Sequence, residues 1–160
     1  MNQTPSISNE LDFVDDGLPV YSTPFSIDLF NMQGAENIGT YFQAIRSLPT
    51  AMYRIMMDHT TGIVINKTIG DVYSLSAEQC KELTRIVRDV LLSKIYVGDL
   101  VDVIAKQLVV DADVSQKIAN ELVAKLFKSA MDDIKALQVA HFSDRIGKPT
   151  GDNVLNLKKK

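Results

Sequence analysis

Apolar residues recur at helical spacing through much of the chain. The longest such stripe lies within residues 77–95 and contains Cys80, Leu83, Ile86, Val87, Val90 and Leu91. Residues three and four positions apart share one face of an α-helix, so this stripe predicts an amphipathic helix over residues 77–95. Ser76 precedes it and Gln79 follows three residues later, which is the sequence of a capping box. We expect Gly98 to end the helix as a C′ glycine.

Further stripes extend the helical prediction over residues 36–142. They predict helices over residues 36–46 and 50–59, and over about 63–73, where a short β-run at 63–65 is the alternative. Asp99 is expected to cap the next helix. A long last helix should start near Asp111 or Asp113 and run to Phe142, with a bend near Ser129.

The pattern repeats when the sequence is shifted by 35 residues. Ile65 then falls on Leu100, Ile69 on Ile104, and Ser76 on Asp111, and both residues of this last pair are good N-caps. We therefore predict an all-α fold, a small multi-helix bundle of two αα-hairpins with a possible 35-residue internal repeat. Two amphipathic hairpins also share positions by chance, so coincidence is the alternative.

Residues 1–34 break the helical pattern with three prolines and many Ser, Thr and Asn residues, yet they carry aromatic and aliphatic side chains. Phe25, Ile27 and Leu29 alternate, as in a short strand or an extended docking peptide. We expect an extended arm over residues 1–34, a helical domain over 35–142 and a basic disordered tail over 143–160. The candidate partner-binding residues are Phe13, Tyr21, Phe25, Ile27, Leu29 and Phe30. The alternative is that the arm packs on its own domain.

Charge is distributed unevenly along the chain. Residues 1–45 contain six acidic residues and no Lys or Arg, whereas the remainder has 17 basic and 14 acidic residues, the total of 20 less those six. This asymmetry indicates either a contact between the arm and the body or an arm offered to a basic partner. A merely solvated acidic arm is the third interpretation.

The motifs of catalysis and cofactor binding are missing from the sequence. The eight glycines form no phosphate-binding loop, and one cysteine with two separate histidines is a poor supply of zinc ligands. The run from Asp111 resembles the start of a calcium loop, but Gln116 and Leu122 stand where that loop needs Gly and Glu. Cys80 lies on the apolar stripe and is expected to be buried rather than nucleophilic. We expect no cofactor, no metal and no enzymatic activity.

A helix-turn-helix is the competing interpretation of residues around Ser76. The helix over 77–95 would then read DNA with Lys81, Arg85, Arg88 and Lys94. However, Glu78 and Glu82 occupy the early face where a recognition helix presents basic and amide groups. Nucleic acid is therefore the less favoured partner.

Residues of about 50–140 resemble a family of small helical domains in uncharacterised proteins of candidate-phyla (Patescibacteria) bacteria. The resemblance rests on LSAEQ, VLLSKI, GDLVDVIAKQL and AKLF. The family pattern often has glycine after VLL, where this chain has Ser93, and proline after the last Phe, where it has Lys128. The resemblance implies an all-helical module and assigns no chemistry.

These patterns together favour a non-enzymatic protein–protein interaction or assembly module. It would bind a protein partner, or associate with itself, through the arm or a helical groove. An apolar-ligand pocket between the hairpins is a further possibility. The chain lacks an apolar run of membrane-spanning length, and its first residues lack the features of a secretory signal, so we expect a cytoplasmic protein without a membrane span.

Overall fold

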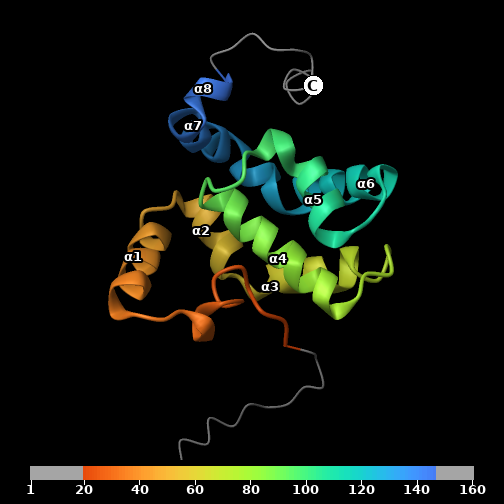
Figure 1. Cartoon of the computed structure of the whole chain (residues 1–160), viewed down its shortest axis with the longest axis horizontal. Helices are drawn as coiled ribbons and strands as arrows, with labels where there is room; N and C mark the ends of the chain where they lie inside the picture. Colours follow the sequence, from red (N-terminus) through yellow and green to blue (C-terminus); the bar gives the residue numbers. More distant parts are fainter. Residues whose placement is uncertain (1–19, 147–160) are drawn as a thin grey trace, which may run out of the picture.

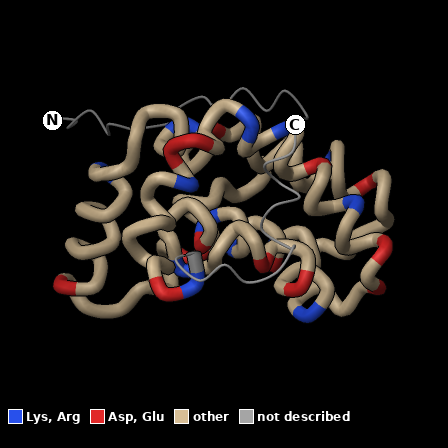
Figure 2. The backbone as a smooth tube through the Cα atoms, turned by 90° about the horizontal axis from the view of Figure 1, so that it is seen from above, with Lys and Arg blue, Asp and Glu red and all other residues tan. Residues whose placement is uncertain are grey.

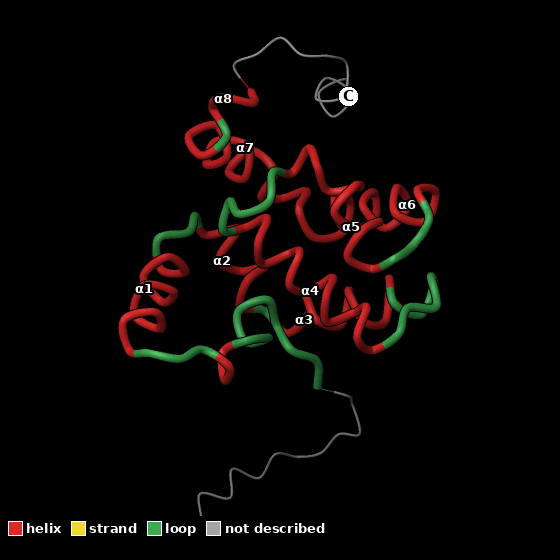
Figure 3. The backbone as a smooth tube through the Cα atoms, in the orientation of Figure 1, coloured by secondary structure: helices red, strands yellow, loops and turns green. Residues whose placement is uncertain are grey.

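The structure is a computed structural model that describes residues 20–146, and these form a helical bundle without a β-strand among them (Figures 1 and 3). This confirms the predicted all-α fold. The helices are α1 (Ala35–Arg46), α2 (Thr50–Met57), α3 (His59–Ile63), α4 (Ala77–Leu91), α5 (Leu100–Leu108), α6 (Ala112–Leu122), α7 (Met131–His141) and α8 (Ser143–Ile146).

Helix α4 runs through the centre of the bundle (Figure 1) and contacts α2, α5 and a π-helical turn, Val64–Ile69. It begins as predicted: the Ser76 hydroxyl accepts from the Gln79 N–H at 3.1 Å, and the Ser76 N–H donates to Gln79 Oε1 at 2.8 Å. Its apolar stripe is buried, and Leu83, Ile86 and Val87 have no exposed surface. Burial of this stripe against three neighbours fixes α4 as the scaffold for the other helices.

The two predicted hairpins are present and share one turn geometry. Ser74 and Val109, 35 residues apart, both adopt left-handed backbone conformations with φ of 52° and 55°. Each is followed by an N–H that donates to a carbonyl five residues back, at 2.8 Å for Leu75 and 3.2 Å for Val110. The caps match as well, since Ser76 has φ −68° and ψ 164°, and Asp111 has φ −69° and ψ 165°.

The side chains that follow these turns are also buried in equivalent pairs. Leu83 and Ile118 are both fully buried, as are Val87 and Leu122. Gln79 Nε2 donates to the Leu108 carbonyl at 2.8 Å, so the first cap is joined to the second turn. The hairpins therefore pack through α4 and α5, with the two turns side by side.

Helix α4 ends earlier than predicted. It stops at Leu91, and Ser93 takes the left-handed position with φ 57° while Lys94 N–H donates to the Asp89 carbonyl at 2.8 Å. The prediction that Gly98 is the C′ residue is therefore wrong. Gly98 instead lies under the Tyr96 ring, where an added Cβ would come within 2.5 Å of Tyr96 Cε1.

Two other predicted helices also have different boundaries. Asp58 interrupts the segment predicted as one helix over 50–59, because its carboxylate accepts from the Thr60 N–H at 2.9 Å and caps α3. That hydrogen bond also lowers the pKa of Asp58. The helix predicted over 63–73 comprises the end of α3 and the π-helical turn, and it ends at Ile69 rather than at residue 73. Ile65 and Ile69 of its predicted stripe are fully buried, whereas Val72, the third member, is 69% exposed.

The long last helix is divided as well. A π-helical turn, Val123–Phe127, and a 3-10 turn, Lys128–Ala130, separate α6 from α7, so the regular helix is interrupted at the place where a bend near Ser129 was predicted. Asp99 stands at the N-cap position of α5 but makes no side-chain cap hydrogen bond. Its carboxylate accepts from Arg145 Nη2 at 2.7 Å, and the Arg145 guanidinium lies 4.9 Å from the centre of the Tyr96 ring. Residues 143–146 are thus helical rather than part of a tail, and residues 147–160 lie outside the described range.

Candidate partner-binding surface

The described part of the arm forms a turn on the helical bundle and not an extended strand. Thr23 and Pro24 begin this turn: the Ile27 N–H donates to the Thr23 carbonyl at 3.0 Å, and the Ser26 N–H donates to the Thr23 hydroxyl at 3.2 Å. A Thr cap followed by Pro is a common start of a helical turn, and a 3-10 turn at Leu29–Asn31 continues it. The extended conformation predicted from the alternation of Phe25, Ile27 and Leu29 is therefore wrong for residues 23–31.

Phe25 fixes the turn to the helical body. Its ring stacks on Tyr41 of α1, with ring centres 5.7 Å apart, and meets the edge of Phe42 at 5.5 Å. Its N–H donates to the Met56 carbonyl at 3.1 Å, and the Tyr41 hydroxyl donates to the Phe25 carbonyl at 2.7 Å. Burial raises the pKa of Tyr41 to about 12, so its hydroxyl remains a donor over the physiological pH range.

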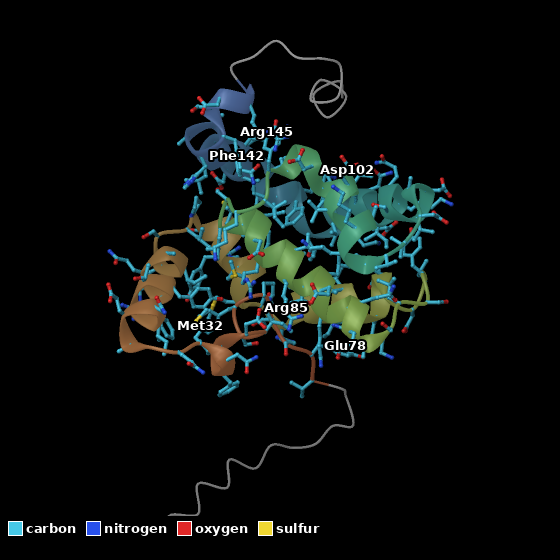
Figure 4. All side chains as sticks on the ribbon, viewed as in Figure 1. Met32, Glu78, Arg85, Asp102, Phe142 and Arg145 are labelled. Atoms are coloured by element: carbon cyan, nitrogen blue, oxygen red, sulfur yellow. The ribbon has the colours of Figure 1, made fainter. Side chains whose placement is uncertain are left out.

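Asp28 makes the second attachment, to two arginines of α4. Its carboxylate accepts from Arg85 Nε at 3.1 Å and also pairs with Arg88 (Figure 4 labels Arg85). These side chains are largely covered, with exposed fractions of 25% for Asp28 and 14% for Arg88. Burial alone would raise the pKa of Asp28, but the hydrogen bonds from Arg88 and Arg85 outweigh it and lower that pKa. Charge-assisted hydrogen bonds of this kind orient a carboxylate specifically.

The arm also lies close to α3. Gly62 is buried, and a Cβ added there would come within 3.0 Å of both the Ser22 carbonyl oxygen and Tyr21 Cβ. A larger residue at this position would therefore push the arm outward by a few tenths of an ångström. We call the residues that hold the arm the arm-docking surface; they are Tyr41, Phe42, Met56, Gly62, Arg85 and Arg88.

Some of the predicted partner-binding residues face the helical body, and others face solvent. Tyr21 faces α3, while Phe25 and Leu29 pack against the core. Phe30 is 96% exposed, and Ile27 is half-buried. Phe13 lies outside the described residues. Packing on the chain's own domain, the alternative left open by the sequence, is thus what Tyr21, Phe25 and Leu29 do.

A cleft of about 380 Å³ opens beside the arm, between α1 and the end of α4. Its lining combines apolar groups with two amides, two hydroxyls and one lysine: Met32, Gln33, Asn37, Thr40, Tyr41, Ala44, Leu92 and Lys94. The core between the hairpins is filled by fully buried side chains such as Ile104, Ile118 and Leu122. The cleft is therefore not the pocket between hairpins that the sequence suggested.

Helix α4 does not present a free basic face to DNA. Arg85 pairs with Asp28 and Glu82, Arg88 pairs with Asp28 and Asp89, and Lys81 pairs with Glu78 at 3.2 Å. Over the described residues, basic positions are interspersed with acidic ones (Figure 2). These pairs neutralise positive charge at the α4 positions that a nucleic-acid interface would use.

Residues 20–146 contain no group of three or more His, Cys, Asp or Glu side chains placed to hold a metal ion. Within the same range, every helix is too short or too polar to cross a membrane. Comparison of the chain with models of protein families, with curated proteins and with solved structures found no match.

The sequence did not identify the residues that receive the arm. Tyr41 lies 16 positions from Phe25, and Arg85 and Arg88 lie 57 and 60 positions from Asp28, so nothing in local spacing joins them to their partners in the arm. The charge asymmetry between arm and body was the available signal. It indicated a contact of this kind as one of three interpretations without naming its residues.

Proposed function

We propose that this protein is a non-enzymatic protein-interaction module in which the arm and the surface beneath it bind a protein partner. The observation that supports this proposal is how residues 21–29 are held. An aromatic anchor, two main-chain hydrogen bonds and a paired carboxylate are the contacts by which domains bind peptide segments of other proteins. The helical body thus has a surface built for an acidic, aromatic segment.

Phe30 supplies a second contact, on the outer side of the arm. The docked neighbours Phe25 and Leu29 hold Phe30 in solvent, where it is 96% exposed. An aromatic side chain held in solvent by a rigid support makes an effective anchor in a protein interface, because little conformational freedom is lost on binding.

Substitution of Phe30 tests this proposal. Tagged full-length protein carrying Phe30→Ser should lose at least one protein that the unchanged chain captures from an extract of its own cells, or should lose self-association at about 100 µM, since hot-spot aromatics dominate binding energy. Val139→Ser is the matched control, because Val139 is an exposed apolar residue on α7. A capture profile and an oligomeric state that are unchanged by Phe30→Ser would contradict the proposal.

A further inference from the structure

The arm-docking surface binds two side chains of the arm that are three residues apart in the sequence. The turn that starts at Thr23 directs both Phe25 and Asp28 toward the body, one to the Tyr41 and Phe42 rings and the other to Arg85 and Arg88. The remaining contacts of Phe25 are made by its main-chain N–H and carbonyl, which every residue except proline offers. The pattern recognised by side chains is therefore Phe-x-x-Asp.

The same pattern occurs once more in the arm. Phe13 is followed three residues later by Asp16, and these two residues lie twelve positions before Phe25 and Asp28. Phe30 does not match, because Gln33 stands at its third following position. Glu10, Asp12 and Asp15 surround the upstream copy, so it carries more negative charge toward the arginine pair than the resident segment does.

We infer that Phe13–Asp16 is a second ligand of the arm-docking surface and exchanges there with Phe25–Asp28. This inference rests on the proposed function, since it requires that the surface binds peptide segments. The Phe13–Asp16 segment that binds the surface belongs to the same molecule, because a segment tethered by a short flexible linker has an effective concentration in the millimolar range. A second copy of the chain at micromolar concentration competes poorly with it.

The chain is long enough for this exchange. When Asp16 occupies the place of Asp28, the 18 residues 17–34 connect the surface to the start of α1. Residues 29–34 make the corresponding connection now, so the exchange lengthens an existing loop about threefold. The entropic cost of closing a loop grows only with the logarithm of its length, so this change is small.

The two segments are not equivalent. Thr23 and Pro24 preform the turn of the resident segment, whereas Leu11 and Asp12 precede Phe13. The resident segment is therefore the favoured occupant of the free protein. A partner that binds at Phe30 and pulls the resident segment away leaves a surface that Phe13–Asp16 then covers, which lowers the cost of releasing the resident segment.

Peptide binding to the purified full-length chain tests the inference. The chain is emptied of both ligands by Phe13→Ala, Asp16→Asn, Phe25→Ala and Asp28→Asn, and fluorescent peptides of residues 9–18 and 21–31 are titrated into it. Both should bind, and each should bind the unchanged chain about tenfold more weakly or worse, since its own segments compete. Peptides of residues 9–18 with Phe13→Ala or Asp16→Asn should lose about tenfold in affinity.

The outcomes separate the inference from the proposed function. Binding of the 21–31 peptide without binding of the 9–18 peptide overturns the inference and leaves the proposed function intact. Failure of both peptides to bind a helical, cooperatively unfolding variant overturns the inference and removes the observation that supports the function. If the fourfold variant does not fold, the two peptides are compared on Asp28→Asn with Asp16→Asn, which retains both Phe anchors and so weakens the two competing segments without removing them. If the unchanged chain forms a dimer and the emptied variant does not, Phe13–Asp16 binds the surface of a second copy. That result would overturn the inference that the segment binds within its own molecule.

Discussion

Individual residues with left-handed backbone conformations form the turns of this bundle. Ser74, Ser93 and Val109 each have positive φ, and none is a glycine. Val109 carries the greatest strain, because a β-branched side chain in this region crowds its own backbone. Its side chain is 86% exposed, so packing contacts offset little of this strain. The turns are thus set by hydrogen bonds and by hydrophobic contacts of their flanks rather than by the residue at the turn.

Val109→Gly should therefore stabilise the protein. Removal of the strained side chain is expected to raise the free energy of unfolding by about 1 kcal/mol. Val139→Gly, in the ordinary helical conformation of α7, should instead lower it by about 0.5 kcal/mol. Urea denaturation followed by circular dichroism measures both. A loss of stability in Val109→Gly would show that the turn needs its side chain.

At the scale of secondary-structure elements, buried polar contacts attach one helix to another. Gln138 of α7 is 1% exposed, and its side chain bonds the segment after α4: Oε1 accepts from the Val97 N–H at 2.8 Å, and Nε2 donates to the Ile95 carbonyl at 2.8 Å. These bonds satisfy the backbone of a buried, irregular segment. They fix α7 to the segment that follows α4, and hydrophobic spacing in the sequence gives no sign of these polar contacts.

Gln138→Leu tests this attachment. The substitution preserves volume but leaves the Val97 N–H and the Ile95 carbonyl without partners, so the free energy of unfolding should fall by about 3 kcal/mol. Gln107→Leu is the control at an exposed position of α5 and should change it by less than about 0.5 kcal/mol. Equal effects of the two substitutions in thermal unfolding would contradict the role of Gln138.

At the scale of the whole molecule, the arm is joined to the body by charge as well as by the Phe25 anchor. The Asp28 carboxylate has a lowered pKa, so its contribution is present above its unfolded pKa near 3.8 and is lost as the pH falls through the folded value. This places the loss of the ion pair in strongly acidic solution and leaves the arm attached at neutral pH.

Asp28→Asn should reproduce this loss at neutral pH. The variant should unfold at lower urea concentration than the unchanged chain at about pH 6. The gap should narrow as the pH falls below 3.8 and close only below the lower pKa that Asp28 has in the folded chain. Glu36→Gln, an exposed acidic change on α1, is the control for net charge. A gap that persists at low pH would show that the charge of Asp28 is not what attaches the arm.

The sequence predicted those parts of the fold that depend on local spacing. The burial of Leu83 and Ile118 and the caps at Ser76 and Asp111 follow from periodicity and from polar residues beside it. The turn at Thr23 was not predicted, because the alternation of Phe25, Ile27 and Leu29 indicated an extended segment. The contact between Asp28 and Arg88 spans 60 residues, and sequence spacing carries no information about such a pair.

Hydrogen exchange of the Phe25 amide tests the central claim most directly, namely that residues 21–29 are docked on the helical body. This N–H donates to the Met56 carbonyl, so we predict that it exchanges about 100-fold more slowly than in an unstructured peptide. Asp28→Asn should reduce that protection while amides of α4 such as Val87 keep theirs. Exchange of the Phe25 amide at the unstructured rate in the unchanged chain, with α4 still protected, would contradict the claim.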